Sequence, residues 1–150
     1  RLVDFRSPPR AGRGGSQRER SFALLGFTHF WGRSRKGRWV VQRKTAKDRF
    51  TRALRAAGRW CRAHRHWPVA DQHAALSRKL QGHYAYYGIT GNLCALARFH
   101  FEVRRLWRKW LIRRSWHTRM PWTLFDRLTA RYPLPPPRVV HSIYRRAATP

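Results

Sequence analysis

The sequence predicts a mainly α-helical protein: an antiparallel bundle of three helices, preceded by a β-hairpin and followed by a short helix and an extended tail. Apolar residues recur at steps of three and four from residue 45 onward, which is typical of amphipathic helices. Aromatic and β-branched runs lie on either side of a basic turn before them. With 150 residues and 42% hydrophobic content, the chain can build a modest core.

The first 45 residues combine strand-like and flexible segments. Residues 1–5, RLVDF, have the pattern of a strand, and residues 6–20 contain proline, glycine, serine and charge with almost nothing to bury, which indicates a flexible connection. The runs SFALLGFTHFWG and GRWVVQRK flank the basic turn 33–37 and predict a β-hairpin with a positively charged tip. Because the chain begins without methionine inside a predicted strand, we expect a fragment of a longer reading frame.

Residues that favour the start of a helix divide the helical region into three predicted helices. Thr45 and Asp48 have the spacing of a capping box, with Asp in place of the usual Glu or Gln. Pro68 is suited to open the second helix, and Asn92 is suited to cap the third. A glycine, at position 88 or 91, is expected to end the second helix.

Three apolar stripes predict the buried faces of these helices. In chain order they comprise Phe50, Ala53, Leu54, Ala57, Trp60, Cys61 and His64; Val69, His73, Leu76, Leu80, Tyr84 and Tyr87; and Leu93, Leu96, Phe99, Val103, Leu106, Trp107 and Trp110. A shorter helix is expected over 121–131, because Trp122, Phe125 and Leu128 keep the same spacing, and PLPPPR beyond it should be extended.

Net charge indicates the class of partner. Thirty-four Lys and Arg stand against six acids, so the formal charge is +28 and a polyanion is needed to offset the self-repulsion. Basic residues are interleaved with aromatic ones along the whole chain, which favours nucleic acid over an anionic membrane surface. Arginine predominates, either because it suits bidentate phosphate contacts or because the genome is GC-rich. Two cysteines and the lack of a long apolar stretch favour a cytoplasmic protein.

The residues offer little support for catalysis or metal binding. A two-metal centre needs converging acids, and no two are adjacent among Asp4, Glu19, Asp48, Asp71, Glu102 and Asp126. Zinc could in principle be held by the string Cys61, His64, His66 and His73. Structural zinc sites usually pair two closely spaced ligand couples, and helix burial explains Cys61 and His73 better. We therefore expect no cofactor in this chain.

The tryptophans are expected to divide between core and surface. Trp60, Trp107 and Trp110 fall on apolar stripes, whereas Trp31 and Trp39 flank the basic hairpin tip and are candidates for stacking on RNA.

Four segments together resemble the C-terminal part of bacterial group II intron reverse transcriptases, the intron-encoded maturases. They are LLGFTHFWGRSRKGRWVVQRKTAKDRF, LSRKLQGHYAYYGITGN, RLWRKWLIRRS and YPLPPPRVVHSIYR, and they occur in the order found in that family. The family hallmarks match at Leu24, Leu25, Gly26 and Phe27, and again at Leu80, Gly82, His83, Tyr86, Tyr87 and Gly88. Gln81 stands where the family usually has arginine, so the resemblance does not imply a phosphate contact at this position.

The resemblance implies a domain organisation and a function. It implies the end of the reverse transcriptase palm over 1–45, the thumb or domain X over 46–116, and a C-terminal extension over 117–150. The family binds group II intron RNA, stabilises it for splicing and copies it into DNA during retrohoming. Copying depends on a Tyr-x-Asp-Asp motif in the palm, which this chain lacks, and Mg²⁺ is expected only for the missing palm and for the intron ribozyme.

The expected role is therefore RNA binding without polymerisation, by arginines and lysines on the hairpin tip and the exposed helix faces. An active RNA-directed DNA polymerase whose palm is missing here, with an RNA–DNA primer–template as further partner, is the alternative from another class. A general RNA chaperone is the third. The predicted RNA-binding residues are Arg33, Arg35, Lys36, Arg38, Lys44, Lys47, Arg49, Arg78, Lys79, Arg104, Arg105, Arg108, Lys109, Arg113 and Arg114.

Overall fold

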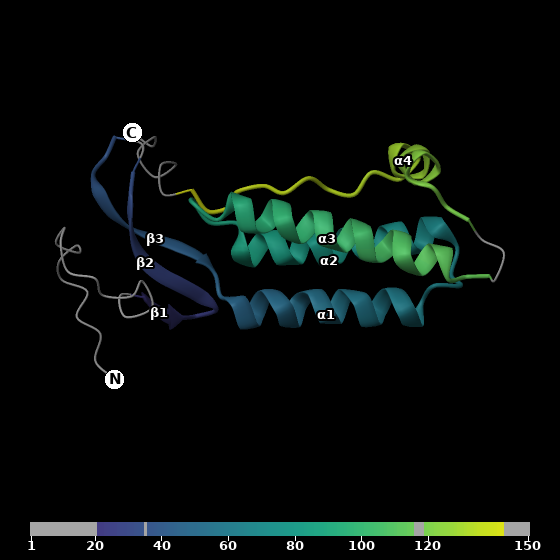
Figure 1. Ribbon diagram of the computed structural model, residues 1–150, viewed down its shortest axis with the longest axis horizontal. Coiled ribbons are helices and arrows are strands. Elements are labelled where there is room, and N and C mark those ends of the chain that lie inside the picture. Colours follow the sequence, from purple (N-terminus) through teal and green to yellow (C-terminus); the bar gives the residue numbers. More distant parts are fainter. Residues whose placement is uncertain (1–20, 35, 116–118, 143–150) are drawn as a thin grey trace, which may run out of the picture. The chain divides into compact units, whose positions relative to one another are not determined.

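The computed structural model describes residues 21–34, 36–115 and 119–142. In this part of the chain a three-stranded antiparallel sheet is followed by four helices, which hold more than half of the residues (Figure 1). Two compact units meet in the sequence between Arg49 and Phe50. The predicted strand RLVDF and the connection 6–20 lie outside the described residues.

The sheet contains two hairpins, where the sequence predicted one. Its strands are β1 (Ser21–Leu24), β2 (Phe27–Arg33) and β3 (Trp39–Thr45), in the order β1-β2-β3. The expected single strand SFALLGFTHFWG turns back at Leu25 and Gly26, whose φ angles are 50° and 80°. Positive φ at both central residues is the geometry of the two-residue hairpin turn that matches strand twist. The prediction was wrong because leucine at the first turn position is not a usual turn signal.

The first helix, α1 (Lys47–Ala63), begins two residues after β3 ends. Thr45 is the last strand residue, so it lies one position too early for the predicted capping box with Asp48. The backbone N–H of Ala46, the residue before the helix, instead donates to the carbonyl oxygen of Gly26 in the first hairpin turn at 2.9 Å.

The helices α2 (Val69–Tyr87) and α3 (Leu93–Ile112) begin where the sequence predicted, after Pro68 and Asn92. Gly88 ends α2, and its N–H donates to the carbonyl oxygen of Tyr84. The capping mechanism at Asn92 differs from the prediction. Its side chain makes no cap hydrogen bond with α3 and instead donates backwards to the carbonyl oxygen of Tyr87 at 2.8 Å.

One hydrophobic core joins α1, α2 and α3, which lie side by side in Figure 1. The predicted stripes supply most of it, but Leu93 is 47% exposed and Leu111, outside the predicted stripe, is buried. The fully buried side chains are Trp107, Tyr84, Phe125, Leu76, Leu80, Leu96, Leu111, Gln72, Val103, Asn92 and Cys61.

Gln72 is the polar exception within this core. Its Oε1 accepts from Trp107 Nε1 at 2.9 Å, and its Nε2 donates to the carbonyl oxygens of Trp67 and Arg65. Every polar atom of the side chain is thus hydrogen-bonded, which removes the penalty of burying an amide.

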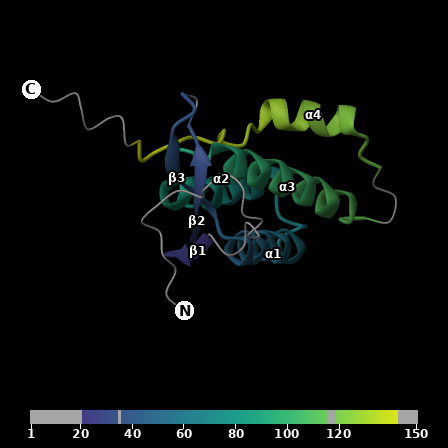
Figure 2. The same cartoon turned by 60° about the vertical axis from the view of Figure 1, so that its left-hand side comes forward.

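The last helix, α4 (Trp122–Arg131), and the extended segment after it pack onto the other helices. Phe125 is fully buried against Trp107, with ring centroids 5.9 Å apart. In Figures 1 and 2 the segment after α4, coloured yellow, runs along α2 and α3 back to the turn between them. The segment PLPPPR, predicted to be extended, forms neither helix nor strand, and Figure 1 shows it drawn out along the helices.

The end of this segment is hydrogen-bonded to Gly88. Its carbonyl oxygen accepts from the N–H groups of Val140 and His141 at 2.7 and 2.8 Å. A Cβ on Gly88 would meet the carbonyl oxygens of Tyr84 and Arg138, the latter at 2.8 Å. Glycine is therefore required here for the close approach of two backbone segments.

Candidate nucleic-acid interface

Positive charge dominates the surface that the structure describes. Within the described ranges three ion pairs form, Asp48 with Arg49, Asp126 with Arg104, and Glu102 with Arg105. The remaining arginines and lysines of this part have no carboxylate within ion-pairing distance. Unpaired cations at this density repel each other.

The β2–β3 hairpin tip presents Arg33, Lys36 and Arg38, while Arg35 lies outside the described residues. The Ser34 N–H donates to the carbonyl oxygen of Arg38, the Gly37 N–H donates to the carbonyl oxygen of Ser34, and Gly37 has a positive φ of 73°. The Arg33 guanidinium lies 5.1 Å from the centroid of the Trp39 ring. The tip thus carries exposed cations beside an aromatic ring, as the sequence predicted.

Three further candidates lie around the start of α1. Lys44 Nζ is 5.0 Å from the Phe30 ring centroid, and Lys47 and Arg49 are exposed in the first helical turn. Cations at a helix N-terminus oppose the helix dipole, and Asp48 offsets this for Arg49 alone. A bound phosphate near this turn would relieve the remaining repulsion.

Among the candidates at positions 104–114, one group holds α4 and a second lies around Trp110, while Arg105 and Arg114 belong to neither. Arg104 binds Asp126 and Thr129 of α4, and Arg108 donates to the carbonyl oxygen of Met120 while its guanidinium lies 4.3 Å from the Trp122 ring centroid. These two arginines hold α4 against α3. The other contacts within the protein are Arg105 with Glu102, and Arg114 with the carbonyl oxygen of Trp67.

Lys109 and Arg113 belong to the second group, because both lie around Trp110. Lys109 Nζ and Arg113 Cζ are 5.6 and 5.4 Å from its ring centroid, and Arg62 of α1 is 5.9 Å away. Three cations, one from α1, one from α3 and one from the residue after α3, thus surround one indole, and none of them pairs with a carboxylate in the described part of the chain. Arg62 was not among the predicted residues, since only tertiary packing brings α1 to Trp110.

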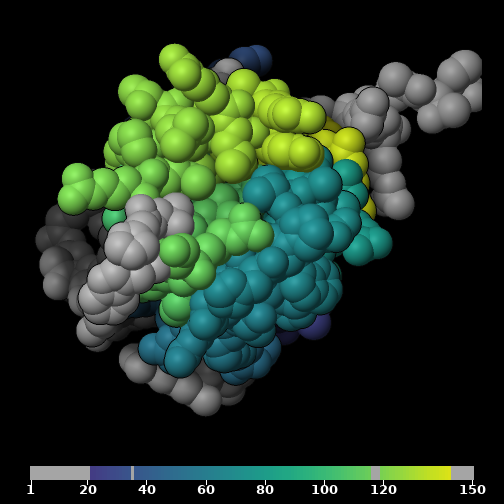
Figure 3. Space-filling model, turned by 90° about the vertical axis from the view of Figure 1, so that its right-hand side faces the viewer, coloured from purple at the N-terminus to yellow at the C-terminus, as the bar shows by residue number. Residues whose placement is uncertain are grey.

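Aromatic rings gather where α1 ends and α2 begins. The rings of Trp60 and His64 stack with centroids 4.6 Å apart, and Trp67 packs edge-on against His64 at 4.2 Å. Trp67 is 45% exposed, and Lys79 Nζ lies 5.5 Å from the Trp60 ring. Figure 3 views this end of the helices, where the loop after α1, the end of α3 and α4 form a continuous surface. Stacking on RNA was predicted only for Trp31 and Trp39.

The segment QGHYAYYGITGN is mainly structural. Tyr84 is fully buried, burial raises its pKa to about 12, and its hydroxyl donates to the carbonyl oxygen of Pro135 at 3.3 Å. Tyr87 packs against the core, while Tyr86 is 54% exposed. Gly82 has open space around its Cα, unlike Gly88. The helix of this segment therefore contributes a buried face and a docking point for the C-terminal segment.

The described residues bring no three His, Cys, Asp or Glu side chains together in a way that could hold a metal ion. Cys61 is buried, and burial raises its pKa to about 12, which keeps the thiol protonated. His64 Nδ1 contacts the carbonyl oxygen of Trp60 at 2.9 Å, and His73 Nε2 that of Pro133 at 2.8 Å. The contact of His64 is local to the end of α1, whereas that of His73 joins α2 to the segment after α4.

The helices in the described part of the chain are too short or too polar to cross a membrane. Compared with known proteins, the chain matches no family model, no curated protein and no solved structure. The functional interpretation therefore depends on the residues and their geometry.

Proposed function

We propose that the chain is an RNA-binding module of the group II intron maturase type. In this proposal α1, α2 and α3 form the antiparallel three-helix thumb, or domain X, and the sheet is the end of the palm. The observation that carries it is the set of exposed cations without carboxylate partners around aromatic rings, above all at Trp110 and Trp39. Arginine and lysine beside aromatic rings can neutralise phosphates and stack on unpaired bases.

The packing of the C-terminal segment supports the resemblance. Two of the four matching segments, QGHYAYYG and YPLPPPRVVH, are about 50 residues apart in sequence and contact each other through Gly88 and Tyr84. Contact with the C-terminal segment thus explains both the glycine at position 88 and the tyrosine at position 84. A pattern that combines these segments is more specific than basic charge alone.

The proposed mechanism is electrostatic and architectural. Lys109, Arg113 and the hairpin-tip cations neutralise closely spaced phosphates of group II intron RNA, so that intron domains approach each other and hold the splicing-competent fold. The module would act in the cytoplasm and carry no cofactor of its own. Mg²⁺ would serve the intron ribozyme and, in a full-length polymerase, a palm that also places an RNA–DNA primer–template against the thumb.

A binding experiment tests this proposal. We would measure the affinity of the chain for a bacterial group II intron RNA and for an unrelated structured RNA of equal length, by filter binding at 50 to 200 mM salt. If about ten phosphates are engaged, affinity falls by roughly a thousandfold or more across this range. Affinity that is insensitive to salt would refute the electrostatic mechanism. Equal affinity for both RNAs at 200 mM would identify a general RNA chaperone.

A further inference from the structure

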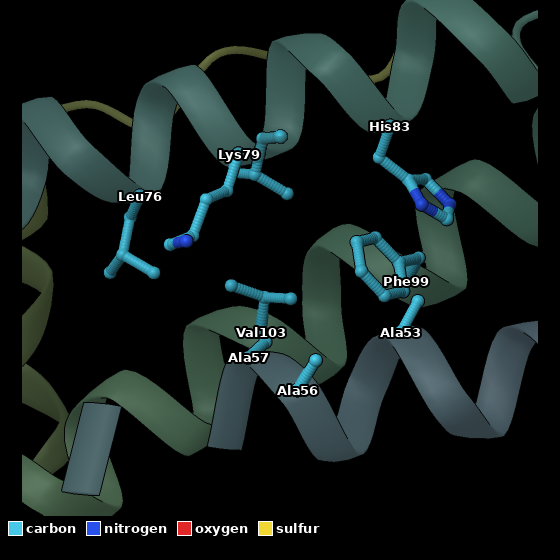
Figure 4. Close-up of a pocket in the computed structure, with 9 residues that line it drawn as sticks. Ala53, Ala56, Ala57, Leu76, Lys79, His83, Phe99 and Val103 are labelled. Carbon is cyan, nitrogen blue, oxygen red and sulfur yellow. The ribbon is translucent and has the colours of Figure 1, made fainter. Parts of the chain in front are cut away.

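A cavity of about 280 Å³ lies between α1, α2 and α3 (Figure 4). Seven of the nine side chains that line it are apolar, and the two polar ones are those of Lys79 and His83. The lining residues are Ala53, Ala56 and Ala57 of α1, Leu76, Lys79, Leu80 and His83 of α2, and Phe99 and Val103 of α3.

Small side chains on α1 create this space. The alanines face α2 in Figure 4, and their methyl groups leave the gap between the two helices unfilled. Protein interiors rarely contain voids larger than a water molecule, since voids forfeit packing contacts. Ala56 and Lys79 are exposed, so the cavity opens to solvent.

One wall is a pair of stacked rings. His83 and Phe99 lie with centroids 3.8 Å apart and ring planes 14° from parallel. Burial lowers the pKa of His83 to about 4, so its imidazole is neutral at physiological pH. The wall is therefore flat, aromatic and uncharged, which suits another flat ring.

A cation marks the opening. Lys79 Nζ lies near the Trp60 ring, and no carboxylate of the described residues forms an ion pair with it. A ligand that satisfies both features has a flat apolar ring attached to an anionic group. An unpaired nucleotide has this chemistry, and a chain of net charge +28 recruits polyanions to its surface.

We propose that this cavity takes one unstacked nucleobase of bound RNA, with a neighbouring phosphate beside Lys79. The inference rests on the proposed RNA binding and adds a preference for bulged or single-stranded sites. An apolar cavity of about 150 Å³ is enough for benzene, so 280 Å³ accommodates the one or two rings of a base. Sequence-tolerant stacking contributes to affinity for each base that is held in this way.

Two hairpin RNAs test the proposal, one fully paired and one with a single bulged 2-aminopurine. We expect the wild-type chain to bind the bulged RNA about tenfold more tightly and to change the fluorescence of the probe. Ala56→Leu fills the mouth of the cavity from an exposed position and should abolish both effects. Ala97→Leu is the matched control, because Ala97 is an exposed α3 alanine that does not line the cavity.

A second pair of variants distinguishes a specific effect of the Lys79 ammonium group at the cavity from a general effect of positive charge. Lys79→Gln should reduce the preference for the bulged RNA, whereas Arg78→Gln, one position away, should weaken binding to both RNAs equally. Equal wild-type affinity for the two hairpins, or a preference that survives Ala56→Leu, would overturn the cavity proposal while RNA binding stands. Failure of the wild-type chain to bind either RNA would overturn the proposed function as well.

Discussion

His83 makes the stability of the protein depend on pH. In the folded chain burial lowers its pKa from 6.5 to about 4, whereas in the unfolded chain the imidazole titrates near 6.5. Between these values the unfolded state binds more protons than the folded state. Stability is therefore complete above pH 6.5 and falls as the pH drops toward 4.

The magnitude follows from the difference between the two pKa values. A shift of roughly 2.5 units corresponds to about 3 kcal/mol, because each unit is worth about 1.4 kcal/mol. Most of this loss should be present by pH 4. For a domain with a total stability of about 5–15 kcal/mol, a loss of this size is readily measured.

Replacing His83 by phenylalanine isolates this contribution. His83→Phe keeps a ring against Phe99 but cannot take up a proton. Urea unfolding at pH 7 and pH 4 should show that the variant loses about 3 kcal/mol less than the wild type. Burial also lowers the pKa of His100, but this effect is common to both proteins and cancels in the difference.

A substitution at an exposed position provides the control for this experiment. Gln81→Asn at an exposed position changes no titratable group and should leave the pH dependence of the wild type unchanged. If His83→Phe lost as much stability as the wild type between pH 7 and pH 4, a buried neutral imidazole at position 83 would be the wrong description.

Two further substitutions test the packing. Gly88→Ala should destabilise the chain by about 1–3 kcal/mol in thermal unfolding, because its Cβ would meet backbone atoms. The control Gly82→Ala, at a helix position with open space, should stabilise the chain by up to about 1 kcal/mol. Equal effects of the two substitutions would contradict the close approach at position 88. Gln72→Leu should lower the free energy of unfolding in urea by about 2–4 kcal/mol, because it leaves Trp107 Nε1 unpaired. The control Gln81→Leu, at an exposed position, should change this free energy little. An unchanged stability of Gln72→Leu would refute the buried network.

Local patterns predicted the helices better than the sheet. The steps of three and four in α3 identified Leu96, Phe99, Val103 and Trp107 as buried, because one face of this helix is covered along its middle. They failed at the ends, where Leu93 is exposed and Leu111 is covered. Periodicity reports which face of a helix is apolar, while the neighbouring segments decide how far along the helix that face is covered.

Turn and capping geometry was harder to predict. A leucine with φ of 50° closes the first hairpin, although residues other than glycine, asparagine and aspartate seldom adopt this conformation. The Asn92 side chain lies at the predicted N-cap, yet it donates to Tyr87. At Leu25 the turn itself was not predicted, whereas at Asn92 the helix start was correct and a contact with the preceding helix determined what its side chain binds.

At the candidate interface, too, the sequence predicted the general property and the tertiary structure determined the details. Composition alone predicted a basic surface for a polyanion, but fifteen arginines and lysines looked equivalent on it. The structure distinguishes Arg104 and Arg108, which hold α4, from Lys109 and Arg113, which surround Trp110 with Arg62. Contacts between residues far apart in sequence made that distinction, and no local pattern encodes them.

By itself the sequence determined the positions of the helices, the sign and size of the charge, and the apolar faces that bury a core. These properties are local or additive, so they can be read along the chain. Only the tertiary structure decided that the C-terminal segment contacts Gly88, that Gln72 is buried with every polar atom paired, and that three alanines leave a cavity beside His83. Each of these depends on which segments meet in space, because hydrogen bonding and steric fit act between neighbours that the order of residues does not specify.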